Sequence, residues 1–251
     1  MKVRFLGTGG FINVGIPYNS FLIDGVHLIE APPDIMVSLN NSGVRYQELK
    51  SIFVSHFHGD HYFGLPFFIL NLFNYYLETE RAVDKIMLIG PRGLRNQLID
   101  LQKIAVAPDN PSVDWIDQVF SFTEIDQHSQ FPFGSASKMI FHRMNHAKET
   151  YGFSIIGDGE YKLTYLSDTK WDESFGQIPS KKPRFVICDL NGGGPDKIRA
   201  HMAEEDITKK AMNLTGKATK YIGTHLRNHQ KSSVENLVYA KMGHEFEAGE
   251  I

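Results

Sequence analysis

Short runs of apolar residues bounded by Gly, Asp or Asn dominate the first 60 residues of the chain. Such runs are typical of β-strands, and they predict strands at residues 3–6, 20–23, 26–29 and 52–54. The pair Asp24-Gly25 separates the second run from the third and predicts a tight hairpin. Apolar positions at a helical spacing predict the first helix at residues 33–42, ending near Gly43.

The rest of the chain alternates strand patterns with longer helical patterns. An apolar stretch at residues 65–77 predicts a helix packed on several sides, and Gly157-Asp158-Gly159 predicts a second hairpin. The other predicted elements are strands at residues 85–89, 119–122, 139–144, 153–156, 161–166, 185–188 and 221–223, and helices at residues 94–105, 203–214 and 233–241. No repeat or linker divides the chain. Residues 1–251 are therefore expected to form one α/β domain, with two mixed sheets flanked by helices.

Composition narrows the class of protein. The chain is 42% apolar and 22% charged with a net charge of −3, which fits an ordinary globular protein. Acidic neighbours balance the basic clusters at residues 181–184 and 209–210, which argues against a long nucleic acid as partner. A single cysteine, Cys188, excludes a disulfide framework or a thiolate zinc cluster within one chain. The strand-like N-terminus and the interrupted apolar segment at residues 63–77 favour a cytoplasmic protein without a membrane span.

The run His56-Phe57-His58-Gly59-Asp60-His61 directly follows the strand predicted at residues 52–54. In an extended turn, His56 and His58 project to the same side and can bind one cation, while Asp60 and His61 turn toward a second. Gly59 allows the sharp bend that brings these ligands together. The run therefore predicts two adjacent metal ions. The alternative is a polar surface loop that happens to be rich in histidine.

Two metal ions need further ligands, and later strands end in suitable residues. His146 follows the strand at residues 139–144. His142 shares its alternation but lies about 13 Å farther back, because each residue of a strand rises about 3.3 Å. We therefore predict His146 as the ligand and His142 as a supporting or structural residue.

Two further strand ends offer one carboxylate and one imidazole. Asp168 ends the strand at residues 161–166, and its two oxygens can bridge two cations; Asp189 is the alternative at a similar strand end. His225 ends the strand at residues 221–223, and His229 is the alternative four residues on. A histidine or aspartate on a surface loop is the competing interpretation for each of them.

The order of these residues resembles the ligand pattern of the metallo-β-lactamase superfamily over nearly the whole chain. The resemblance implies an αββα sandwich with two metal sites that share one bridging carboxylate. The implied ligands are His56, His58 and His146 for one metal ion, Asp60, His61 and His225 for the other, and Asp168 as the bridge.

Finer motifs resemble the phosphodiesterase branch of that superfamily, which includes tRNA 3′-end processing endonucleases and the cyclic phosphodiesterase of phosphonate breakdown. These motifs are Leu6-Gly7-Thr8-Gly9-Gly10, Glu30-Ala31-Pro32-Pro33-Asp34 and Gly64-Leu65-Pro66. Members of the branch carry a further histidine about two dozen residues before the last ligand, and His201 lies 24 residues before His225. The resemblance implies that His201 contacts the phosphate or acts as general acid. The alternative is a surface residue at a helix N-terminus.

Departures from the branch bear on the substrate. The tRNA-processing enzymes commonly insert a long arm between the ligands that correspond to His146 and Asp168, but here that interval is 22 residues and holds the predicted hairpin. A small substrate is therefore favoured. Residues 11–19 contain no cysteine, so the cysteine-rich zinc site of the phosphonate enzyme is absent.

These features predict a hydrolase with two divalent metal ions, zinc being preferred and manganese or iron the alternatives. Two ions lower the pKa of a shared water toward neutrality, so the predicted reaction is attack of metal-bound hydroxide on a small or cyclic phosphodiester. The catalytic candidates are Asp60 and His201. A lactone or ester hydrolase and a non-catalytic metal-binding accessory protein are the alternatives. The resemblance also implies a homodimer.

Overall fold

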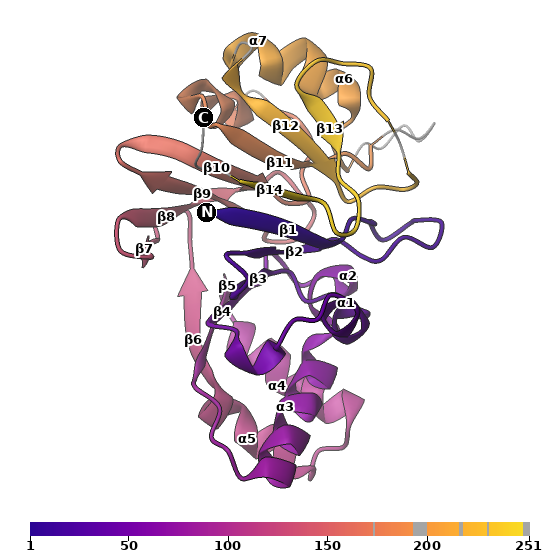
Figure 1. Ribbon diagram of the computed structural model, residues 1–251, viewed down its shortest axis with the longest axis vertical. Helices are drawn as coiled ribbons and strands as arrows, with labels where there is room; N and C mark the ends of the chain where they lie inside the picture. The colour runs from indigo at the N-terminus through magenta and orange to yellow at the C-terminus, as the bar shows by residue number, and fades with distance from the viewer. Residues whose placement is uncertain (173, 193–199, 216–217, 230, 248–251) are drawn as a thin grey trace.

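The computed structural model describes residues 1–172, 174–192, 200–215, 218–229 and 231–247. Two seven-stranded sheets lie face to face between two groups of helices (Figure 1). The arrangement confirms the predicted α/β class with two mixed sheets flanked by helices. Among the described residues, no helix combines the length and hydropathy needed to cross a bilayer.

The first sheet has the order β14-β1-β2-β3-β4-β5-β6. Neighbours from β14 to β3 pair antiparallel, and neighbours from β3 to β6 pair parallel. Its strands are β1 (Lys2–Gly7), β2 (Ser20–Ile23), β3 (His27–Ile29), β4 (Ser51–Phe53), β5 (Ile86–Pro91), β6 (Phe120–Ile125) and β14 (Glu245–Glu247). The helical segments of this half are α1 (Ile35–Asn41), η1 (Tyr46–Glu48), α2 (Gly59–Tyr62), α3 (Leu65–Thr79), α4 (Leu94–Ala105) and α5 (Pro111–Val119).

The second sheet has the order β13-β12-β11-β10-β9-β8-β7. It repeats the pattern of the first, because β7 to β10 pair antiparallel and β10 to β13 pair parallel. Its strands are β7 (Gln130–Phe133), β8 (Ser137–Arg143), β9 (Tyr151–Gly157), β10 (Glu160–Leu166), β11 (Phe185–Asp189), β12 (Lys220–Thr224) and β13 (Leu237–Tyr239). The helical segments of this half are η2 (Ser174–Gln177), η3 (Pro179–Lys181), α6 (Glu204–Asp206), the π-helical η4 (Ile207–Ala211) and α7 (Met212–Thr215).

Alternating side chains build the core between the two sheets. In β1, Val3 and Phe5 are buried between the sheets, whereas Arg4 points away and forms an ion pair with Glu245 at 3.5 Å. Outer cores separate each sheet from its helices; Phe68 of α3, for example, is buried in the core of the first half. The sandwich thus places loops from both sheets along a common edge.

Both predicted hairpins are confirmed. Asp24 and Gly25 join β2 to β3 with φ angles of 51° and 73°, and Asp158 and Gly159 join β9 to β10 with φ angles of 53° and 77°. Left-handed backbone at both central positions matches the right-handed twist of the flanking strands, which explains why Asp-Gly stands at each turn.

Several predicted elements are corrected by the structure. The helix predicted at residues 233–241 is wrong, because β13 lies there and pairs parallel with β12. Leu237 and Tyr239 are buried, while Val238 between them is 51% exposed. This two-residue alternation is that of a strand, and pairing with β12 favours the strand over a helix. The helix predicted at residues 203–214 is a run of α6, η4 and α7 interrupted by a π-helical segment. The sequence patterns also missed α2, α5, β7 and β14.

Candidate metal centre

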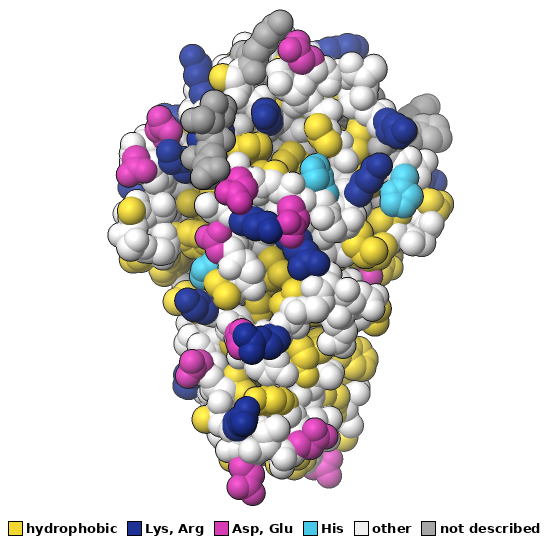
Figure 2. All heavy atoms as spheres, viewed as in Figure 1, with side chains coloured by type: hydrophobic (Ala, Val, Ile, Leu, Met, Phe, Trp, Pro, Cys, Tyr) yellow, Lys and Arg dark blue, Asp and Glu magenta, His cyan; other side chains and the backbone are white. Residues whose placement is uncertain are grey.

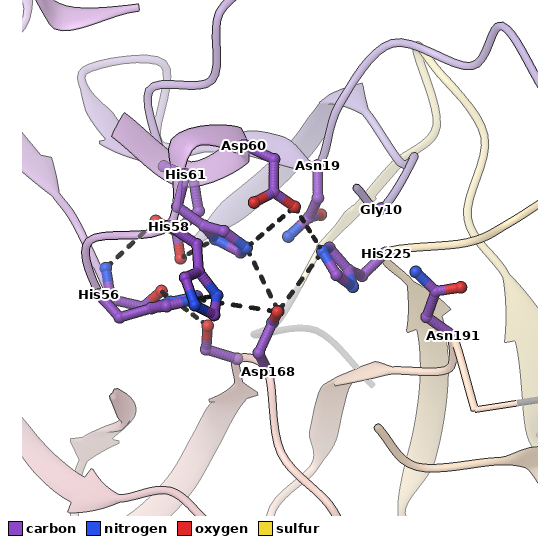
Figure 3. Close-up of polar contacts among 12 residues, drawn as sticks. Gly10, Asn19, His56, His58, Asp60, His61, Asp168, Asn191 and His225 are labelled. Carbon is purple, nitrogen blue, oxygen red and sulfur yellow. Dashed lines mark hydrogen bonds and ion pairs between the residues drawn. The ribbon is translucent and has the colours of Figure 1, made fainter. Parts of the chain in front are cut away.

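The candidate site lies where strands from both sheets end. The parallel strands β10, β11 and β12 bring their carboxyl ends to one edge, so Asp168, Asp189 and His225 emerge side by side. Opposite them, the loop after β4 carries His56 and His58 and leads into the short helix α2. Figure 3 shows side chains from the two halves pointing toward one another.

Three imidazoles form the first donor cluster. His56 Nε2 lies 2.9 Å from His58 Nδ1, and His146 Nε2 lies 3.2 Å from the same atom. The Oδ2 atom of Asp168 is 3.8 Å from both His56 Nε2 and His146 Nε2. One ligand atom of each of these four residues therefore faces a common point.

A second cluster lies on the other side of Asp168. His225 Nε2 is 3.1 Å from Asp60 Oδ2, and His61 Nε2 is 3.5 Å from that oxygen. The Oδ1 atom of Asp168 is 3.3 Å from His61 Nε2 and 3.5 Å from His225 Nε2. The Asp168 carboxylate thus turns one oxygen to each cluster.

Two observations fit this donor set to metal ions. Ligand atoms about 2.0–2.1 Å from a tetrahedral zinc ion lie about 3.3 Å from one another, close to the separations within both clusters. His61 Nε2 is buried and has no hydrogen-bond partner, although a buried imidazole nitrogen normally has one. A cation between the donors would supply the missing partner.

The balance of buried charge points the same way. Four carboxylates at the centre, those of Glu30, Asp60, Asp168 and Asp189, are each at most 5% exposed. None of the described lysines or arginines is buried. Because uncompensated buried charge is costly, these carboxylates require cations at the centre, either protonated imidazoles or two divalent ions.

Side chains behind the clusters orient the imidazole rings. Ser55 Oγ lies 2.9 Å from His56 Nδ1, while Glu30 Oε1 lies 3.4 Å from His61 Nδ1 and Asp189 Oδ1 lies 3.3 Å from His225 Nδ1. Such partners fix the tautomer of a ligand and raise its basicity. Glu30 and His225 themselves have left-handed φ angles of 62° and 58°, a strain that packing around the centre maintains.

A buried chain of hydrogen bonds connects Glu30 to the second sheet. Thr224 Oγ1 donates to Asn19 Oδ1 at 2.6 Å, Asn19 Nδ2 donates to the Tyr165 hydroxyl at 3.1 Å, and that hydroxyl donates to Glu30 Oε1 at 3.0 Å. Ser55 N donates to the other oxygen of Glu30 at 3.1 Å. The position of the carboxylate behind His61 is therefore set by both sheets.

Gly10 allows the loop after β1 to pack directly on the centre. A Cβ atom at Gly10 would lie 2.2 Å from Asn191 Nδ2 and 2.9 Å from the carbonyl oxygen of His225. Figure 3 shows Gly10 and Asn191 close to His225. A larger residue at position 10 would displace His225 from its cluster.

The two clusters differ in their electrostatics. Burial lowers the pKa of His56, His58 and His146, and at His56 the neighbouring imidazole of His61 lowers it further, so the rings of the first cluster favour the neutral form. Burial alone would lower the pKa of His225, but the carboxylates of Asp168 and Asp189 raise it to about 10. Burial alone would raise the pKa of Asp60, but the hydrogen bond with His225 and the nearby imidazole of His61 keep it below its ordinary value. The second cluster thus attracts positive charge more strongly.

His201 lies beside both clusters. Its Nδ1 atom is 2.6 Å from Asp189 Oδ2 and 3.9 Å from Asp168 Oδ2, and its ring lies 5.5 Å from that of His146 and 5.2 Å from that of His225. Burial alone would lower its pKa, but the Asp189 carboxylate outweighs burial and raises it. Because Nδ1 donates its proton to Asp189, Nε2 remains for a ligand.

The remaining alternatives fall outside the two clusters. His142 bonds the hydroxyl of Ser154 at 2.8 Å, and His229 is exposed. Asp189, the alternative bridge, lies outside the two clusters but forms a further group of possible ligands with Asp168, His201 and His225, and it contacts Nδ1 of both imidazoles. The sequence patterns did not place Glu30 at the site, although it stands at the end of a buried strand, as Asp168 does.

Fold and donor pattern together define a protein of the metallo-β-lactamase superfamily. Residues 1–235 match the family described as anti-Pycsar protein Apyc1. A ribonuclease Z of Clostridium perfringens is 31% identical over 94% of this chain and 92% of its own length. The chain thus belongs to the Apyc1 family, in the phosphodiesterase branch of that superfamily.

Solved structures agree with this fold. The metallo-β-lactamase fold protein YhfI of Bacillus subtilis aligns with a TM-score of 0.76 at 15% identity, covering 98% of both chains. A diphosphatase of the PhnP family aligns with a TM-score of 0.72 at 17% identity, covering 98% of this chain and 97% of the other. Matches to other ribonuclease Z proteins are shorter. The chain spans 64% of the length of the Picrophilus torridus protein and 47% of the length of the Lacticaseibacillus casei protein.

Proposed function

We propose that this protein is a phosphodiesterase that uses two divalent metal ions to hydrolyse a small or cyclic phosphodiester. The observation that carries the proposal is the Asp168 carboxylate, whose two oxygens face two separate donor clusters. The ligands are the seven residues of these clusters: His56, His58, Asp60, His61, His146, Asp168 and His225. Imidazole and carboxylate donors suit zinc, with manganese or iron as alternatives.

Two such ions supply Lewis acidity to a phosphoryl group and lower the pKa of a water nucleophile. His201 supplies the proton that the leaving oxygen needs, from Nε2, because its Nδ1 is tied to Asp189. Asp60 holds His225 and His61 in place, and it stays ionised because both imidazoles keep its pKa below the ordinary value. These roles are supported by the position of His201 beside the two clusters and of Asp60 within the second.

Two features support a small substrate. The interval between His146 and Asp168 is filled by the β9–β10 hairpin and leaves no room there for an RNA-binding arm. On the face shown in Figure 2, basic and acidic side chains are interspersed and no large basic surface gathers. Because relatives are named ribonuclease Z and a solved structure of this fold is human tRNase Z, a tRNA precursor is the second substrate to test.

The test begins with elemental analysis of protein purified without added metal, followed by hydrolysis of bis(p-nitrophenyl) phosphate. His201→Ala should lower kcat by about 10²- to 10⁴-fold while metal content stays the same. His229→Ala is the matched control, because His229 is exposed and lies outside the clusters. Unchanged turnover in the His201 variant would remove its proposed role.

Parallel assays separate the competing functions. Hydrolysis of acyl-homoserine lactones in preference to diesters would favour a lactone or ester hydrolase. Metal-loaded protein that cleaves no diester, lactone, thioester or tRNA precursor but retains one metabolite would favour an accessory protein. The cytoplasmic location and the homodimer stay predictions, and sedimentation measures the second directly.

A further inference from the structure

His146 differs from the other proposed ligands in what lies behind its ring. The Nδ1 atoms of His56, His61 and His225 each lie within 3.4 Å of a hydroxyl or carboxylate oxygen. His146 Nδ1 is also buried but has no hydrogen-bond partner among the described residues. Burial lowers the pKa of the His146 ring, and the nearby backbone of Ala200 opposes this shift without forming a hydrogen bond of normal geometry. The position of this ring therefore depends on how its backbone is held.

The loop that carries His146 gives it little support. Residues 144–150 connect β8 to β9 without forming a helix or strand. The backbone bond that closes this loop joins Met144 N to Thr150 O at 2.9 Å, and it therefore lies at the two ends of the loop. His146, near the middle, needs contacts from outside the loop.

Asn145, the residue before His146, makes such contacts with the segment that follows β10. Its backbone N–H donates to Thr169 Oγ1 at 3.1 Å, and its carbonyl oxygen accepts from Lys170 N at 3.1 Å. Its side-chain amide donates to the carboxylate of Asp172. Three hydrogen bonds thus fix the chain next to His146, and one of them comes from a side chain that a substitution can remove.

The segment that receives these bonds is itself anchored beside the bridging carboxylate. Thr169 directly follows Asp168 and is fully buried. Its hydroxyl donates its single proton to Lys170 O at 3.0 Å, so a lone pair remains to accept from Asn145 N. Asn145 therefore joins His146 to Asp168, whose Oδ2 atom lies 3.8 Å from His146 Nε2.

We propose that Asn145 is a positioning residue of the first donor cluster. Its three bonds hold His146 and Asp168 together as one unit that faces the two imidazoles of the first half. None of these bonds involves a residue adjacent in the chain to the other ligands of the second cluster, so binding of the second ion should not depend on them. The inference rests on the ligand set of the proposed function, but it does not depend on which diester is the substrate.

Chelator competition, which resolves the two ions, tests the inference directly. Asn145→Ala should weaken binding of the first ion by about tenfold, the lower end of the range for lost partners that orient a metal ligand. Binding of the second ion should be unchanged. Asn110→Ala is the matched control, because Asn110 caps α5 by accepting from Ser112 N and lies outside both clusters. It should lower the melting temperature without changing either affinity.

Further substitutions identify the bonds that are responsible. Asp172→Ala should also weaken the first ion, and adding Asn145→Ala to it should weaken that ion no further, because both changes remove the same hydrogen bond. Thr169→Ser should keep the wild-type affinity, since its hydroxyl can still accept from Asn145 N. Thr169→Val should weaken the first ion, because it leaves that N–H without its acceptor.

Wild-type affinity for the first ion in Asn145→Ala would overturn the inference, as would equal weakening of both ions. A lower melting temperature with unchanged affinities would show a purely structural role and overturn it as well. If the wild type binds two ions but cleaves no diester, the proposed function fails, while these affinities still decide the positioning role. A wild type that binds fewer than two ions would end both.

Discussion

The two donor clusters of the centre differ in what lies behind their imidazole rings. His56 in the first cluster is backed by the neutral hydroxyl of Ser55, whereas His61 and His225 in the second are backed by the carboxylates of Glu30 and Asp189. A carboxylate behind an imidazole makes it a stronger ligand. We therefore expect the second cluster to bind its metal ion more tightly than the first.

Removing the shared carboxylate should have the largest effect. Asp168→Ala takes one donor from each cluster, so both ions should bind weakly and kcat/KM should fall by roughly 10³-fold or more, given that metal ions supply several kcal/mol to the transition state. Elemental analysis and diesterase kinetics measure both effects. Asp158→Asn in the β9–β10 turn is the control. Retention of two tightly bound ions by Asp168→Ala would contradict the bridging role.

Removing the carboxylates behind the second cluster should weaken that cluster alone. Glu30→Gln should lower affinity for its ion about 10- to 100-fold, as loss of such partners commonly does. Asp189→Asn should do the same and also lower kcat, because Asp189 holds His201 as well. Chelator competition distinguishes the two ions. Equal weakening of both sites by Glu30→Gln would show that the clusters do not differ as inferred.

A smaller effect is expected behind the first cluster. Ser55→Ala removes a neutral hydrogen bond worth about 1 kcal/mol, so affinity for the first ion should fall by about fivefold. The second ion should be unaffected in the same chelator titration. A loss as large as that of Glu30→Gln would contradict the assigned difference between hydroxyl and carboxylate partners.

The smallest effect on the centre should come from His142. Burial lowers the pKa of this residue from 6.5 to about 4, so the unfolded chain binds more protons than the folded one between these values. Its contribution to stability is therefore complete above pH 6.5 and is lost as the pH falls toward 4. In the wild type, this residue should lower the free energy of unfolding by up to about 3 kcal/mol between pH 7 and pH 4. His142→Gln should abolish that part of the decrease, and urea unfolding at the two pH values measures it. The metal content of the variant should equal that of the wild type. A changed metal content would contradict the placement of His142 outside the two clusters.

Local sequence determined the elements whose side chains interact with near neighbours in the chain. The Asp-Gly pairs specify both hairpins because each turn needs left-handed backbone at two adjacent positions. The run from His56 to His61 likewise brings its four polar side chains together within one loop. By contrast, residues 233–241 form a strand because β12 offers a parallel edge to Leu237 and Tyr239, which no local pattern records.

The sequence by itself therefore determined the fold class, the two hairpins and the grouping of His56, His58, Asp60 and His61, since spacing along the chain controls each of them. The resemblance predicted His146, Asp168 and His225 as the further ligands, but only the tertiary structure sets them opposite that loop and leaves His142 and His229 outside it. It also decided that Glu30 and Asp189 stand behind the second cluster. These contacts join residues far apart in the chain, and only the packing of the two sheets sets the distances between them.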